Sequence, residues 1–171
     1  GYDDGASTGE VRRFLGDSLG PSDFRKNASR LATELGSCDR ALVGVLDFRL
    51  PAHSSRDEAM AALGRAAASL PAISGRLDTF LRELTSSGRP FDFGDCSLGN
   101  LVFAGSYLEA NRRFNAAVDD YCGLLGLPPG LVENVTDGTN AFLVALAADG
   151  SVLGSEGEIV DATRHNSIDD I

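Results

Sequence analysis

The sequence predicts part of an α/β domain. Apolar residues recur with helical spacing through the first three quarters of the 171 residues, whereas strand-favouring residues cluster in the last quarter. Two Asp-Gly pairs divide that last quarter as turns would. No complete strand–helix–strand unit is visible. Because helices come first and strands last, we expect residues 1–171 to form a single domain, an incomplete portion of a larger α/β domain that lacks its first strands.

The first helices are predicted from apolar stripes and from residues that begin or end helices. A short helix is expected to end near Gly16, and Pro21-Ser22 begins a second helix that Gly36 ends. Residues 39–50 are apolar and fit either a helix or a strand. The apolar positions of the first two helices are Val11, Phe14, Leu15, Phe24, Ala28, Leu31, Ala32 and Leu35.

Capping signals predict two helices in the middle of the chain. Ser55 and Glu58 have the spacing of a capping box before an Ala-rich segment at 56–69. Pro71 is expected to stop that helix, and apolar residues in register predict another over 72–86.

A buried helix is expected after the loop-like residues 87–96. Ser97 is a suitable N-cap for a nearly all-apolar helix over 98–105. A helix that is apolar on every side must be buried on most sides. Residues 112–125 then predict a conventional amphipathic helix, which Gly126 closes.

The last quarter predicts a strand and a β-hairpin. Strand-favouring residues occupy 131–135, 142–147 and 152–160. The Asp-Gly pairs at 137–138 and 149–150 lie between these segments, and the second is the stronger hairpin signal.

Composition excludes several classes of partner. Hydrophobic residues make up 43% and charged residues 23% of the chain, as in ordinary globular domains. The formal net charge of -10 argues against nucleic acid and anionic membranes as partners, because both need clustered Lys and Arg. A bound phosphate must therefore meet local arginines, of which there are 14 against the single lysine Lys26.

The cysteines and the lack of a targeting signal predict a cytoplasmic location. Cys38, Cys96 and Cys122 are odd in number and far apart, so neither a disulfide framework nor a zinc site is indicated. No apolar run reaches the ~18 residues of a membrane span, and no signal peptide is visible. The sequence leaves a homo-oligomer open.

The opening segment resembles an anion and metal site. Asp3 and Asp4 run into a glycine-bearing loop and then into a basic helix that carries Arg12. A helix start presents unpaired N–H groups to phosphate, and neighbouring carboxylates can hold a divalent cation. Ser7 and Glu10 also have capping-box spacing, which would explain those two residues without a ligand. No lysine follows the glycines as in a Walker loop, so triphosphate hydrolysis is disfavoured.

Four segments, in order along the chain, resemble the 2-phospho-L-lactate transferase family. They are Asp-Asp-Gly-x-Ser-Thr-Gly-x-x-Arg at 3–12, Gly-Pro-Ser-Asp-Phe-Arg at 20–25, Ser-Leu-Gly-Asn at 97–100 and Glu-Asn-Val-Thr at 133–136. The family includes the gluconeogenesis-factor proteins, which are most similar at the first segment. Each motif alone is only moderately specific, but four in one order make a chance match implausible.

The resemblance implies a Rossmann-like three-layer α/β domain with helical additions. Its transferases move a phospholactyl or phosphoenolpyruvyl group from a GDP-linked donor to a deazaflavin acceptor, with Mg²⁺ as cofactor. Its gluconeogenesis-factor branch implies the alternative, a non-catalytic regulator that binds UDP-sugars. Family members usually begin with a strand and a Gly-rich loop that this sequence lacks, so the chain is expected to be a fragment of a longer protein.

The resemblance also implies roles for individual residues. They are Asp3 and Asp4 as catalytic and Mg²⁺-binding carboxylates, Ser7, Thr8 and Gly9 as phosphate donors, Arg12 as a charge on phosphate, Asp23, Arg25 and Asn27 as the opposite wall, and Asn100 as a partner of ribose or base. For Arg25 the alternative is a surface salt bridge with Asp23 or Glu34, and for Asn100 a supporting role at the helix cap. We expect Asp3, Asp4 and Asn100 to converge on one cleft.

Overall fold

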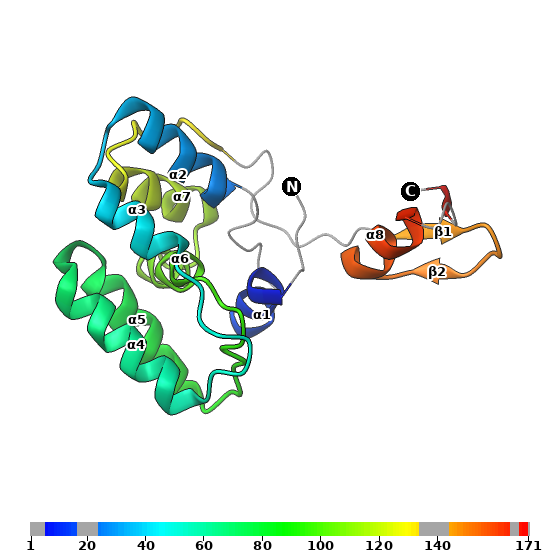
Figure 1. The fold of residues 1–171 in the computed structure, drawn as a ribbon, viewed down its shortest axis with the longest axis horizontal. Helices are drawn as coiled ribbons and strands as arrows, with labels where there is room; N and C mark the ends of the chain where they lie inside the picture. The colour runs from blue at the N-terminus through cyan, green and yellow to red at the C-terminus, as the bar shows by residue number, and fades with distance from the viewer. Residues whose placement is uncertain (1–5, 17–23, 134–143, 165–167, 171) are drawn as a thin grey trace.

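The computed structural model describes residues 6–16, 24–133, 144–164 and 168–170. Helices occupy most of these residues, and a small antiparallel sheet follows them (Figure 1). The helices are α1 (Ala6–Phe14), α2 (Phe24–Leu35), α3 (Arg40–Asp47), α4 (Arg56–Ser69), α5 (Pro71–Ser87), α6 (Leu98–Glu109), α7 (Phe114–Leu124) and α8 (Glu156–Arg164). The strands are β1 (Ala145–Ala147), β2 (Val152–Leu153) and β3 (Ile168–Asp170).

Helix α6 is the centre of the helical body formed by α1 to α7. Every residue from Leu98 to Tyr107 is buried, and α1, α3, α5 and α7 all pack against the helix. Figure 1 looks almost along its axis, with α3, α5 and α7 around it. The sequence-based expectation of a helix buried on most sides is therefore confirmed, and the reason is the nearly uninterrupted apolar run.

Two contacts set how the neighbours of α6 pack. A Cβ atom at Gly105 would overlap the backbone carbonyl of Arg76, so α5 and α6 touch through their backbones at this point. The guanidinium of Arg76 also makes a two-pronged ion pair with Asp120 of α7, at 2.7 and 2.6 Å. The pair joins α5 and α7 on either side of α6.

Aromatic side chains hold α1 and the loop before α6 against α5. Phe14 of α1 packs edge-on against Phe80 of α5 and against Phe91, with ring centroids 5.6 and 5.4 Å apart. Phe91 in turn packs on Phe93, which is 2% exposed. Phe14, Phe80 and Phe93 belong to the main core, whose buried members lie between residues 11 and 127, and Phe91 packs against that core.

Local signals correctly predicted several helix boundaries. The capping box of α4 is present, since Glu58 N donates to Ser55 Oγ and Ser55 N donates to the Glu58 carboxylate. Pro71 ends α4 as expected, and it also occupies the first turn of α5, where a missing N–H costs nothing. Residues 39–50, left open between helix and strand, contain α3, which Asp39 caps by accepting a hydrogen bond from Ala41 N.

The small sheet confirms the predicted hairpin, but its second strand is shorter than predicted. Strand β1 lies between β2 and β3 and is antiparallel to both, and the 149–150 turn joins β1 to β2. The strand predicted over 152–160 ends at Leu153, because Ser155 Oγ accepts from Glu158 N at the start of α8 and Ile159 is buried on that helix. Residues 131–133 are not a strand, and 134–143, with the other turn, lie outside the described residues.

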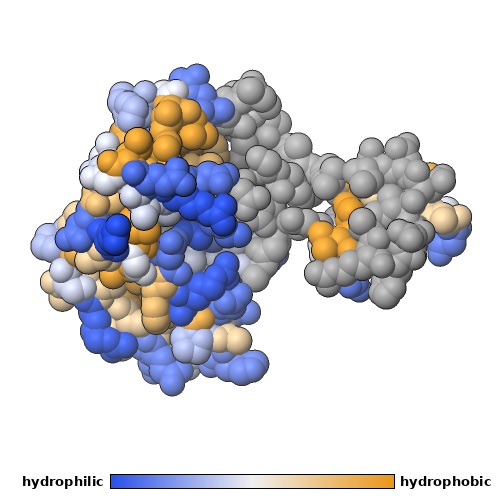
Figure 2. All heavy atoms as spheres, turned by 45° about the horizontal axis from the view of Figure 1, so that its top comes forward, coloured by the Kyte–Doolittle hydropathy of each residue, from blue (hydrophilic) through white to orange (hydrophobic). Residues whose placement is uncertain are grey.

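The surface and the small sheet of the described residues do not test the predicted three-layer fold. Blue and orange areas alternate over the helical body in Figure 2, as on ordinary protein surfaces. In the part of the chain that the structure describes, no helix combines the length and apolar character needed to cross a membrane. The Rossmann-like three-layer arrangement stays a prediction, because the described strands pair only in antiparallel fashion.

Candidate functional site

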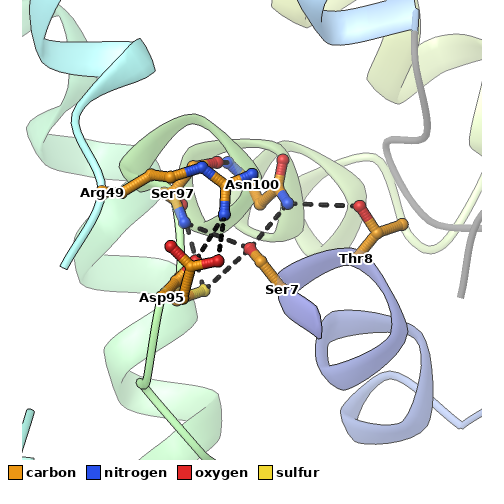
Figure 3. A network of polar contacts seen from close by, with 7 residues as sticks. Ser7, Thr8, Arg49, Asp95, Ser97 and Asn100 are labelled. Atoms are coloured by element: carbon orange, nitrogen blue, oxygen red, sulfur yellow. Dashed lines mark hydrogen bonds and ion pairs between the residues drawn. The ribbon is translucent and has the colours of Figure 1, made fainter. Parts of the chain in front are cut away.

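The starts of two helices, far apart in the sequence, meet at a buried polar network. Ser97 is the N-cap of α6, and its Oγ accepts a hydrogen bond from Asn100 N at 3.2 Å. Ser7 and Thr8 lie in the first turn of α1 and point toward this turn of α6 (Figure 3). Ser7, Thr8, Cys96, Ser97 and Asn100 form what we call the Ser7 network.

The hydroxyl of Ser7 is the centre of the network. Its Oγ accepts from Asn100 Nδ2 at 2.7 Å and from Ser97 N at 3.1 Å, and it lies 3.1 Å from Cys96 Sγ. A hydroxyl oxygen has two lone pairs and one proton, so these three contacts use its full hydrogen-bonding capacity. Ser7 is 3% exposed. Its hydroxyl therefore braces α1 against α6, and phosphate would have to reach other donors nearby.

The predicted capping box of Ser7 and Glu10 is wrong. Ser7 lies inside α1, and its hydroxyl accepts a hydrogen bond from Asn100 of α6. The Glu10 carboxylate accepts from Asp92 N at 2.9 Å and pairs with Arg13 at 2.6 Å. The spacing of Ser7 and Glu10 is that of a capping box, but both side chains bind residues between 92 and 100 instead.

Asn100 reaches both predicted phosphate-binding hydroxyls. Its Nδ2 donates to Ser7 Oγ and, at 3.3 Å, to Thr8 Oγ1. Asn100 and Thr8 are 3% and 6% exposed. Asn100 is the third residue after the Ser97 cap and donates its N–H to that cap, so it takes part in the start of α6 and also links this helix to α1.

Burial controls the chemistry of Cys96. Burial raises the pKa of this thiol to about 12, against smaller opposite effects from the Ser7 hydrogen bond and from the charge of Arg49. A thiol at that pKa is protonated at neutral pH and is a poor nucleophile. Cys96 is thus a buried, protonated member of the network.

Arg25 lies on another side of the same helix turn. A Cβ at Gly99 would be 2.8 Å from Arg25 Cδ, 2.7 Å from Leu46 O and 2.9 Å from the Tyr121 hydroxyl, so only glycine lets these groups approach α6. Arg25 is 4% exposed and donates to Asp47 Oδ1 at 2.7 Å. Its described partner is therefore Asp47 of α3 rather than Glu34. A surface salt bridge does not describe a guanidinium buried to this extent.

Tyr121 completes this buried side of the turn. Burial raises the pKa of its hydroxyl, although the charge of Arg25 acts in the opposite direction. The tyrosine therefore stays neutral beside the buried cation. Sequence reasoning assigned Tyr121 only to the apolar stripe of α7, and no local signal linked it to Arg25.

Arg49 and Asp95 form a second pair that sequence reasoning missed. Arg49 Nη1 donates to the carboxylate and to the backbone carbonyl of Asp95, at 2.8 and 2.7 Å. Asp95 has a left-handed backbone, with φ of 52°, and Arg49 pairs with Ser97 as an isolated β-bridge. Figure 3 shows the pair beside the Ser7 network. The Gly94-Asp95 turn was the one available signal, because Asp tolerates positive φ better than most residues.

The other predicted residues fall into three groups. Gly9 and Arg12 are buried on α1, Arg12 one turn after Thr8. Asn27 is exposed and lies about 200° around α2 from Arg25, so the structure does not bring these two together as one wall. Asp3, Asp4 and Asp23 lie outside the described residues, and so does the expected convergence of Asp3 and Asp4 on Asn100. The described residues contain no cluster of three or more His, Cys, Asp or Glu suited to a metal ion.

The dipole ends of two neighbouring helices are the feature of this arrangement that suits a negatively charged group. The first N–H groups of a helix lack partners within the helix and carry the positive end of its dipole. Here two such starts are adjacent, but the N–H groups of Ser97, Leu98 and Asn100 already donate to Ser7 Oγ, Phe48 O and Ser97 Oγ. Arg12 and Arg25 add buried positive charge on α1 and α2. Comparison with known proteins found no matching family model, no matching curated protein and no matching solved structure.

Proposed function

We propose that this protein binds a nucleotide-diphosphate-linked ligand with Mg²⁺ at the starts of α1 and α6, and that it is a group-transfer protein of the 2-phospho-L-lactate transferase type. The carrying observation is the Asn100–Ser7 hydrogen bond of 2.7 Å, which joins the first and third resembling segments. A diphosphate needs preorganised positive charge. We assign this role to the dipole ends of α1 and α6 and to the buried arginines Arg12 and Arg25. Asp3 and Asp4 come shortly before α1 in the sequence, and carboxylate oxygens suit the Mg²⁺ that we propose they hold.

The proposed chemistry requires little covalent help from the protein. An acceptor hydroxyl attacks the donor phosphorus that carries the lactyl or enolpyruvyl group, and the phosphoanhydride bond breaks. A nucleoside monophosphate leaves, and the hydroxyl proton passes to solvent. Such transfers depend mainly on positioning and on neutralising the charge that develops on phosphate. The proposed transferase role also implies the Rossmann-like three-layer fold of that family.

A specific sequence observation favours a second candidate. The opening segment at 3–12 is most similar to the gluconeogenesis-factor branch, which implies a non-catalytic regulator that binds UDP-sugars. The two candidates share the binding site and differ in the base and in whether a bond is broken. A cytoplasmic location fits both, and neither requires a homo-oligomer.

Calorimetric titration tests the proposal. GDP, UDP and a UDP-sugar are each titrated into the protein with and without Mg²⁺, and then into Asp4→Asn and Asn100→Ala. Tight, Mg²⁺-dependent GDP binding that both variants weaken supports the transferase type. A preference for the UDP-sugar supports the regulator instead.

A matched control and a product assay sharpen the result. Asp57→Asn removes an exposed carboxylate from the first turn of α4 and is expected to bind as the wild type does. With a donor in which lactate is esterified to the terminal phosphate of GDP, and with a deazaflavin alcohol as acceptor, release of GMP identifies the transferase. Binding of none of the three nucleotides with Mg²⁺ would refute the proposed function.

A further inference from the structure

Two arginines from distant segments hold the C-terminal end of α1. Arg89 Nη1 donates to Phe14 O at 2.9 Å, and Arg112 Nη1 donates to Leu15 O at 2.8 Å. The last carbonyls of a helix lack donors within the helix and carry the negative end of its dipole. Guanidinium groups satisfy both, so the two arginines complete α1 from outside.

Arg112 reaches the end of α1 from a turn whose backbone conformation is unfavourable for residues other than glycine. Asn111 and Arg112 both have left-handed conformations, with φ of 54° and 61°. Such values are uncommon for residues other than glycine and persist where surrounding contacts compensate. Here Arg112 N donates to Tyr107 O at 2.8 Å, and the guanidinium also reaches Glu83 of α5 at 3.3 Å. The turn after α6 thus aims a cation at the end of α1.

The other end of α1 is the start of the candidate site. The helix has nine residues, too few to be stable without tertiary contacts. Its position is therefore set by what holds it: the Asn100–Ser7 hydrogen bond at one end, the packing of Phe14, and Arg89 and Arg112 at the other. A shift at the carbonyl end moves the first turn with it, because a short helix behaves as a rigid rod.

We infer that Arg89 and Arg112 are positioning residues for the ligand site: by holding the carbonyl end of α1 they keep Ser7 and Thr8 in register with Asn100. The ligand half of this inference rests on the proposed function. The placement of α1 is independent of it and has its own readout. Neither arginine needs to touch the ligand.

Hydrogen exchange of the full chain measures the placement of α1. Arg89→Ala and Arg112→Ala are each expected to speed exchange of the α1 amides about tenfold, the size of one lost charged hydrogen bond, while α4 amides stay unchanged. Arg112→Lys, which keeps a cation able to reach Leu15 O, is expected to restore most of the protection. Arg113→Ala is the matched control, because Arg113 Nε donates to Ala110 O within its own turn.

Ligand affinity separates positioning from general stability. Dissociation constants for the nucleotide that the wild type prefers, with Mg²⁺, are expected to rise about tenfold in both alanine variants, as for the loss of one charged hydrogen bond. They are expected to stay unchanged in Arg113→Ala and in Ile73→Val, which weakens the core at a fully buried residue of α5.

The outcomes distinguish this inference from the proposed function. Unchanged α1 exchange in both alanine variants overturns it, as does faster exchange with undiminished affinity. If the wild type binds none of the nucleotides, the proposed function and the ligand half fall together, and exchange alone decides whether the arginines place α1.

Discussion

Asn100 Nδ2 donates a hydrogen bond to Ser7 Oγ, and the two residues are 93 positions apart in the sequence and almost fully buried. This bond crosses from the first turn of α1 to the first turn of α6. A buried amide that loses its partner keeps its desolvation cost without compensation. The pair is therefore expected to matter for stability whether or not a ligand binds.

Removing either partner of this bond is expected to destabilise the protein. Asn100→Ala and Ser7→Ala should each lower the free energy of unfolding by about 1–3 kcal/mol, and the double variant by less than the sum. Urea unfolding of all four proteins measures the coupling. Asn27→Ala, at an exposed position of α2, should change stability by less than about 0.5 kcal/mol. Strict additivity would show that the bond does not form.

Gly105→Ala is expected to be strongly destabilising. The new methyl group would overlap the carbonyl of Arg76, and two packed backbones cannot separate without disturbing the core. We expect a loss of about 3 kcal/mol or more, measured by urea unfolding or as failure to fold. Gly64→Ala is the control, because nothing lies within 4 Å of a Cβ there and alanine favours the helix. That control should gain up to about 1 kcal/mol, and similar effects at both glycines would contradict the packing of α5 on α6.

The Arg76–Asp120 ion pair predicts a loss of stability in acid. Burial favours the neutral form of Asp120, but hydrogen bonds and charge from Arg76 outweigh it and lower the pKa of this carboxyl. The folded state therefore binds the proton less readily than the unfolded state, whose pKa is about 4. The stabilisation is present above that pH and is lost as the pH falls through the folded pKa.

Asp120→Asn tests this ion pair. The variant should be about 1 kcal/mol less stable at pH 7, a modest value because the Asp120 side chain is 36% exposed to screening solvent. Below about pH 4 the difference should shrink. Denaturant unfolding from pH 7 to pH 3 measures it, with Asp78→Asn on the exposed face of α5 as the control. A constant difference across this range would mean that the ion pair carries no net stabilisation.

The raised pKa of the buried Cys96 thiol is expected to make the protein less stable in alkali. Its folded pKa of about 12 lies above the ordinary value of 9.0, so between these pH values the unfolded state loses the proton first. This stabilisation is present below the unfolded pKa and is lost as the pH rises toward the folded one.

Cys96→Ala is expected to flatten the alkaline decline. Above about pH 9 the stability of the wild type should fall faster than that of the variant, by up to about 1.4 kcal/mol per pH unit. Urea unfolding between pH 8 and pH 10.5 measures both slopes. Cys38→Ala, at a partly exposed cysteine, should have a smaller effect. Parallel slopes for the wild type and Cys96→Ala would contradict the burial of this thiol.

Most helix positions were predictable because their signals are local. The Ser55–Glu58 box, Pro71 and Ser97 marked helix ends correctly, since each acts on backbone groups within one turn of itself. The strand expected at 152–160 was wrong beyond Leu153 because β-favouring composition is a weak preference that the cap at Ser155 and the burial of Ile159 overrode. The family resemblance and its ligand remain predictions.

By itself the sequence determined where most helices begin and end and that one helix had to be buried. It named Ser7, Thr8 and Asn100 only separately, through the family resemblance. Only the tertiary structure decided what these side chains contact. Ser7 has the spacing of a helix cap, but its hydroxyl links α1 to α6. Arg25 pairs with Asp47 and lies near Tyr121, and both Arg25 and Tyr121 approach α6 closely because residue 99 is a glycine. The physical reason is that caps and periodicity act over one or two turns, whereas a buried hydrogen-bonding group takes whichever partner the packed helices bring within 3 Å or so.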